Sequence, residues 1–138
     1  MIFNNTQRTL VLVIILFTNL AFGMDKNQFF IQSDEFFHLN VEDGLVKYKQ
    51  IKKNDDNIHD LVNYVSNADL SSFDSTEKLA FYINAYNLLV INQIIEKYPV
   101  ESPTSIPGFF DIKKHMIAGE KLTLNDLENK RIRTYKDS

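Results

Sequence analysis

Hydrophobic residues recur every three or four positions along much of the chain after residue 23, a spacing that predicts amphipathic helices. Three such helices are expected, at about residues 27–37, 54–67 and 74–97. Asp74 can cap the third helix together with Glu77, three residues later, in a capping-box arrangement. The pattern therefore predicts a mainly helical chain up to about residue 97.

The pattern changes after residue 100. Residues 101–108 contain two prolines and predict a loop. Residues 109–117 and 121–124 then flank a central Gly119 and show an alternation that predicts a β-hairpin.

Two shorter stretches complete the expected secondary structure. Residues 41–44 predict a turn, followed by a brief extended piece at 45–48. Thr123 can cap a last short helix, with Asp126 near its positive end. The expected fold class is α+β, mostly helical with a small antiparallel hairpin or sheet, preceded by an N-terminal signal helix.

The first 23 residues have the layout of a secretory signal peptide. Arg8 supplies a positive charge, residues 10–20 are apolar and uncharged, and Ala21 and Gly23 are small residues at the −3 and −1 positions before Met24. The apolar run is shorter than the roughly 20 residues of a bilayer span, and no cysteine follows it to carry a lipid. We expect an exported protein, periplasmic or secreted, with residues 1–23 as the signal peptide and 24–138 as the mature part. An uncleaved N-terminal anchor is the alternative.

Composition limits the partners. Cleavage would remove Arg8 and no acid, which leaves 14 basic and 18 acidic side chains and a net charge of −4. Scattered acids without a basic patch argue against a nucleic-acid partner. The chain has no cysteine, so it has no disulfide partner, no thiol nucleophile and no thiolate metal ligand. After signal cleavage no stable membrane span is expected, and no cofactor is predicted.

Three segments carry a resemblance to a known family. They are Val46-Lys47-Tyr48, the run LAFYINAYNLLVINQIIEKYPV, and the later GEKLTLNDLENKRIR. In this order and spacing they resemble the DUF547 family, over roughly residues 43–138. The resemblance implies a domain of mixed helix and strand, found mostly in exported bacterial proteins, with no settled function.

The chain departs from the family pattern at its end. In the family, the stretch matching residues 128–138 leads into a strand that contains a histidine and a cysteine, and this sequence stops before that strand. We therefore expect residues 24–138 to be the N-terminal portion of an incomplete domain, whether a fragment, a frameshift product or a genuine short form. The expected function is a non-catalytic binding or interaction module. The alternative is the remnant of an exported hydrolase, thiol-peptidase-like, whose catalytic segment is missing.

The histidines offer little catalytic chemistry. His59 lies near Asp55 and Asp56, but acidic residues at a helix start are typical of a solvated first turn, so no metal site is predicted. His115 falls in the first strand of the hairpin and is expected to be exposed. His38, the third histidine, lies far from the other two in the sequence.

The expected central helix carries Tyr82, Asn84, Tyr86 and Asn87, which are the candidate binding residues. At 100° per residue the two asparagines lie about 60° apart, on the side of several apolar residues, and Gln93 falls on another side. We expect both amides to point into the core and to bond loop backbone, since buried amides need partners. The functional alternative is that they line a pocket or orient a catalytic group.

Overall fold

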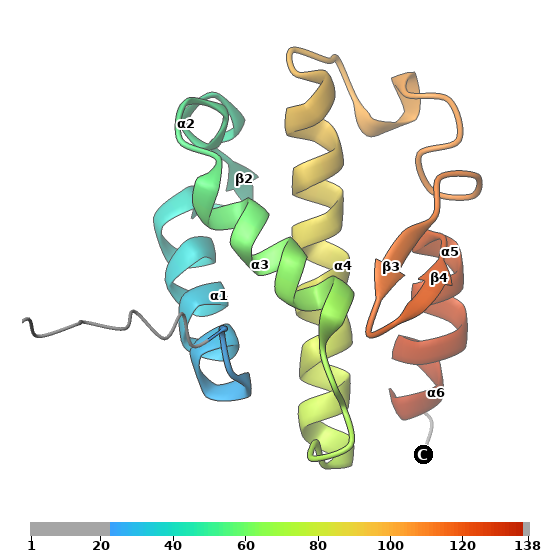
Figure 1. Ribbon diagram of the computed structural model, residues 1–138. Helices are drawn as coiled ribbons and strands as arrows, with labels where there is room; N and C mark the ends of the chain where they lie inside the picture. Colours follow the sequence, from blue (N-terminus) through green and yellow to red (C-terminus); the bar gives the residue numbers. More distant parts are fainter. Residues whose placement is uncertain (1–22, 137–138) are drawn as a thin grey trace, which may run out of the picture.

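The computed structural model describes residues 23–136, so nearly all of the expected signal peptide lies outside the described residues. One long helix, α4 (Ser75–Lys97), stands at the centre of the molecule (Figure 1). Helix α1 (Lys26–Asn40) lies on one side of it, α3 (Asp56–Asn67) crosses it diagonally, and the C-terminal hairpin and helices lie on the other side. In the described part of the chain, no helix is long and apolar enough to cross a bilayer.

Three helices begin with reciprocal capping boxes. The Glu77 N–H donates to Asp74 Oδ1 at 2.8 Å at the start of α4, and the Asp126 N–H donates to Thr123 Oγ1 at 3.1 Å at the start of α5 (Leu124–Leu127). Both starts confirm the sequence prediction. A third box, in which Asp25 caps α1, was not foreseen.

Two short antiparallel hairpins complete the fold class. Strand β1 (Val41–Glu42) pairs with β2 (Leu45–Val46), and β3 (His115–Ile117) pairs with β4 (Glu120–Leu122). Each is closed by a two-residue turn with positive φ at both positions, Asp43-Gly44 and Ala118-Gly119. This geometry matches the natural twist of a hairpin. The α+β prediction is confirmed, with two separate two-stranded sheets.

The structure differs from the prediction between residues 45 and 53. The extended segment ends at Val46, and Tyr48 already begins α2 (Tyr48–Lys53), which was not predicted. The helix is one and a half turns long, so it shows no apolar period. Its single buried residue, Ile51, ties it to the core.

A second difference concerns the C-terminal region. Residues 109–112 form a turn and 113–114 are irregular rather than strand, because Gly108 takes a φ of +69° and its carbonyl accepts from the Ile112 and Lys113 N–H groups. The loop before them contains the short helix η1 (Pro103–Ser105). The last helix is longer than expected, since α5 continues through the π-helical η2 (Glu128–Ile132) into α6 (Arg133–Lys136).

One hydrophobic core joins these elements. The Phe29 ring of α1 lies 4.6 Å from the Tyr64 ring of α3 and 5.5 Å from the Phe81 ring of α4, centroid to centroid. The β3–β4 turn is fastened to the end of α3, where the Ala118 N–H donates to the Val65 carbonyl at 2.8 Å. Segments far apart in sequence therefore hold α4 from several sides.

Candidate functional site

The four candidate residues of α4 face two different sides of the helix. Tyr82 and Tyr86 face the C-terminal helices. The Tyr82 ring lies 6.0 Å from the Tyr135 ring, and burial together with the nearby Glu128 carboxylate raises the pKa of the Tyr86 hydroxyl. Asn87 faces the other way, toward α1 and the first hairpin. The structure therefore does not bring the four residues together in one site.

The prediction that Asn84 and Asn87 point into the core is wrong. Asn87 is exposed and Asn84 is half-buried, and neither side chain hydrogen-bonds to any residue that the structure describes. The helix is apolar on nearly all sides, so its residue pattern does not tell which side the rest of the chain covers. Packing against α3 and the C-terminal helices decides this, and it leaves Asn87 exposed and Asn84 half-buried.

Gln93 is the buried amide of α4, although the helical pattern predicts it on another side than the apolar residues around the asparagines. Its side chain is 1% exposed, and its Nε2 donates to the Phe109 carbonyl at 3.2 Å. The Oε1 atom has no hydrogen-bond partner among the described residues. Gln93 thus forms the kind of internal hydrogen bond that was expected of the asparagines, since it bonds the backbone of the segment that follows the proline loop. The sequence offered no signal for this, because an apolar pattern on nearly all sides of α4 does not mark the buried face.

Tyr82 lines a cavity of about 440 Å³ between α4 and the C-terminal helices. Burial raises the pKa of the Tyr82 hydroxyl, and the nearby Arg131 opposes this shift. Arg131 is itself ion-paired with Glu120, and the neighbouring Lys130 pairs with Asp126 at 2.8 Å. Both cationic groups are engaged in ion pairs within the fold, so this cavity offers no unpaired charge for a ligand.

A small apolar recess of about 340 Å³ lies beside Asn87, between α4, the end of α1 and the first hairpin. The β1–β2 register pairs Val41 with Val46 on the face that lines the recess, whereas Leu45 is 74% exposed and does not line it. Its lining residues are Phe37, Val41, Gly44, Val46, Tyr48, Asn87, Val90 and Ile91. Apolar walls with few polar groups are typical of ligand pockets. Here two of the segments that resemble DUF547, some 40 residues apart, meet at one place.

A second cleft, of about 640 Å³, adjoins this recess and shares Val46 and Tyr48 with it. It is lined by Val46, Lys47, Tyr48, Lys49, Gln50, Lys53 and Tyr98. Lys47 pairs with Glu42 at 3.0 Å, but Lys49 and Lys53 are exposed and form no ion pair within residues 23–136. Burial raises the pKa of the Tyr48 hydroxyl at the junction. We call the recess and the cleft together the amphiphilic groove.

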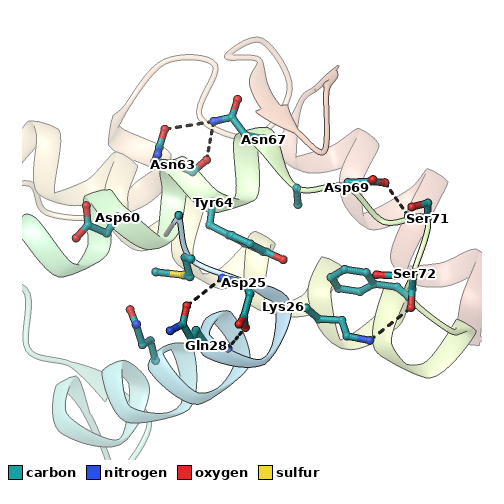
Figure 2. Close-up of a pocket in the computed structure, with 15 residues that line it drawn as sticks. Asp25, Lys26, Gln28, Asp60, Asn63, Tyr64, Asn67, Asp69, Ser71 and Ser72 are labelled. Atoms are coloured by element: carbon teal, nitrogen blue, oxygen red, sulfur yellow. Dashed lines mark hydrogen bonds between the residues drawn. The ribbon is translucent and has the colours of Figure 1, made fainter. Parts of the chain in front are cut away.

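A polar pocket of about 810 Å³ lies between the start of α1, one face of α3 and the α3–α4 connection (Figure 2). Much of its polar lining is bonded internally, as the dashed lines show. Asp25 and Gln28 form the α1 capping box, Asn67 donates to Asn63, and the Ser71 N–H donates to Asp69. These bonds fix helix ends and a turn, so the pocket is a structural hollow rather than the best candidate site.

The histidines do not assemble a metal centre. His59 Nδ1 lies 3.9 Å from an Asp55 oxygen in an exposed pair, and the part of the chain that the structure describes has no group of three or more metal-ligating side chains. The expectation that His115 is exposed is wrong, because it is half-buried and its Nε2 has no partner among the described residues. Burial lowers the pKa of His115, and Lys113 adds to this effect while Glu96 opposes it.

The fold and the groove define a small α+β domain with a candidate binding surface on its central helix. Residues 70–138 match the family model described as "Protein of unknown function, DUF547", and the chain belongs to this family. The match begins after Val46-Lys47-Tyr48. The resemblance of this segment to the family is therefore supported by its own residues and not by the family model. No curated protein and no solved structure matches the chain.

Proposed function

We propose that this DUF547 protein acts after export as a non-catalytic binding module that holds an apolar side chain of a partner protein in the amphiphilic groove. The observation that carries the proposal is the recess beside Asn87. Its volume of about 340 Å³ lies at the lower end of the range for ligand pockets, and its walls are mainly apolar.

Asn87 suits this role. Its amide can both donate and accept, it is exposed at the recess, and it forms no hydrogen bond to a described residue. A peptide backbone offers the matching N–H and C=O groups. The recess would take the apolar side chain of a bound segment, and Asn87 would bind its backbone.

The start of the fold supports the export part of the proposal. Met24, the residue after the expected cleavage point, packs against the core, and Asp25 caps α1. A mature chain that begins at Met24 would keep both features. If the full chain is expressed in a bacterial host, we expect N-terminal sequencing of the exported protein to begin at Met24. An uncleaved chain recovered from the membrane would contradict export as a free protein.

The binding part is tested with N-acetyl-leucine methylamide, a minimal apolar side chain with peptide groups on both sides. We expect millimolar concentrations to shift the amide resonances of Gly44, Val46 and the Asn87 side chain in ¹H–¹⁵N spectra. Asn87→Ala should weaken the remaining shifts severalfold. Asn84→Ala is the matched control, since Asn84 lies on the same helix but does not line the recess. The proposal fails if no resonance of the recess moves, or if the two variants behave alike.

A further inference from the structure

We infer that the partner segment carries carboxylates beside its apolar anchor, and that Lys49 and Lys53 bind them in the cleft adjoining the recess. This inference rests on the proposed function, because it names the chemistry of the partner that the amphiphilic groove accepts. It concerns the cleft, whereas the proposed function concerns the recess.

The charge distribution points to an anionic partner. The expected mature chain has a net charge of −4, yet residues 47–53 contain four lysines and no acid. Lys47 is paired with Glu42, whereas Lys49 and Lys53 line the cleft without an ion pair to any described residue. A positive cleft on an acidic protein attracts an acidic segment and orients its approach.

The helix geometry brings the two charges together. Lys49 and Lys53 are four residues apart on α2, so both lie on one side of this helix, and like charges at this spacing repel each other. A carboxylate between them would relieve the repulsion. Lys52 is exposed on the same helix but does not line the cleft.

The shape of the groove favours a peptide over a membrane. The recess and the cleft share Val46 and Tyr48, so one ligand can place an apolar group in the first and an anionic group in the second. An anionic membrane would instead need apolar side chains that protrude near the lysines. Leu45 is exposed but lines neither the recess nor the cleft, so a membrane bound through Leu45 would leave the recess empty, and this makes the membrane alternative testable.

Two peptides test the inference on the purified protein. Acetyl-Ala-Leu-Ala-Asp-Glu-Asp-amide carries an apolar anchor with three acids, and acetyl-Ala-Leu-Ala-Asn-Gln-Asn-amide is its uncharged counterpart. By titration calorimetry or NMR at 50 mM NaCl, we expect the acidic peptide to bind about three- to tenfold more tightly, the range for a few exposed charge pairs. The advantage should shrink at 500 mM NaCl because salt screens exposed charges.

Variants assign the effect to the cleft. The double variant Lys49→Gln/Lys53→Gln should lose the advantage of the acidic peptide while it still binds the uncharged one. The control variant Lys52→Gln should keep most of the advantage of the acidic peptide. If both peptides bind equally, or if Lys52→Gln has the same effect as the double variant, the inference is overturned while the proposed function stands.

Other results separate the remaining possibilities. If neither peptide nor N-acetyl-leucine methylamide perturbs the recess, the proposed function itself fails. Binding to anionic phosphatidylglycerol vesicles that is lost in Leu45→Ser, without preference between the peptides, would identify a membrane surface and overturn the inference. A dimer that dissociates in the Lys49/Lys53 variant would identify a second copy of the chain as the occupant, and would also overturn it.

Discussion

At the scale of single residues, the structure buries a different side-chain amide of α4 from those that the sequence predicted to be buried. Gln93 is buried and is the hydrogen-bond partner of the Phe109 carbonyl, whereas Asn87 is exposed. An exposed amide without internal bonds is available for binding, and a buried one is needed for folding. The two roles considered for the asparagines, bonding backbone in the core and lining a pocket, therefore belong to different residues.

We expect Gln93→Ala to lower the free energy of unfolding by about 1–3 kcal/mol, because the Phe109 carbonyl would lose its partner in the interior. Asn87→Ala should change it by less than about 0.5 kcal/mol, as is usual for an exposed site. Urea denaturation measures both values. An equal loss in the two variants would contradict the assignment of Gln93 as the structural amide.

His115 makes stability depend on pH. Burial lowers its pKa in the folded state below the ordinary value of 6.5, so the unfolded chain binds more protons under mildly acidic conditions. The stability that neutral His115 contributes to the folded state is fully present above pH 6.5, and it is lost as the pH falls through the pKa of His115 in the folded state. We expect the free energy of unfolding to drop between pH 7 and pH 5, and the drop to be smaller in His115→Gln. His38→Gln, which removes an exposed histidine, is the control, and an unchanged slope in His115→Gln would refute the effect.

At the scale of elements, local side-chain bonds set the helix starts. Asp74 Oδ1 accepts from the Glu77 N–H, and Glu77 in turn accepts from the Asp74 N–H at 3.0 Å. Glu77 also pairs with Lys26 of α1 at 2.8 Å, which links the starts of two helices. Lys26 lowers the pKa of the Glu77 carboxyl.

We expect Asp74→Ala to lower the free energy of unfolding by about 0.5–2 kcal/mol, the usual cost of losing an N-cap. Asp74→Asn is the matched control, since asparagine caps nearly as well. Thermal or urea unfolding of the two variants gives the comparison. Equal destabilisation by both would show that the charge matters rather than the hydrogen bond.

At the scale of the whole molecule, the residues matched by the family model do not make up the core alone. Phe81 and other core residues of α4 pack against Phe29 of α1 and against α3, which precede residue 70. Without the first 69 residues, the side of the central helix that packs against α1 and α3 would be exposed to solvent. The family match therefore covers part of a single folding unit.

We expect a chain of residues 70–138 alone to lack a cooperative fold, because so short a chain with one side of α4 uncovered buries too little apolar surface. Circular dichroism during heating would show a gradual change, and ¹H–¹⁵N spectra would show poor dispersion. The full chain is the reference. A sharp thermal transition in the fragment would disprove the single-unit description.

Part of this fold could be predicted because its causes are local. Asp74 with Glu77, and Thr123 with Asp126, mark helix starts through bonds three residues long, and the glycine at 119 marks a tight turn. Helix α2 was missed because one and a half turns show no period. The strand expected at 109–114 was wrong because the conformation of Gly108 turns the chain there.

The sequence by itself determined the three long helices, the caps of α4 and α5, the β3–β4 hairpin and the family. It also limited the chemistry, since a chain without cysteine has no thiol. Only the tertiary structure decided which side of α4 is buried, and with it that Gln93 lies inside and Asn87 lies at the groove. The physical reason is that a helix apolar on nearly all sides has no preferred inner face until α3 and the C-terminal helices cover one. The lysines of α2 likewise line the cleft beside the recess only because α2 packs against the central helix.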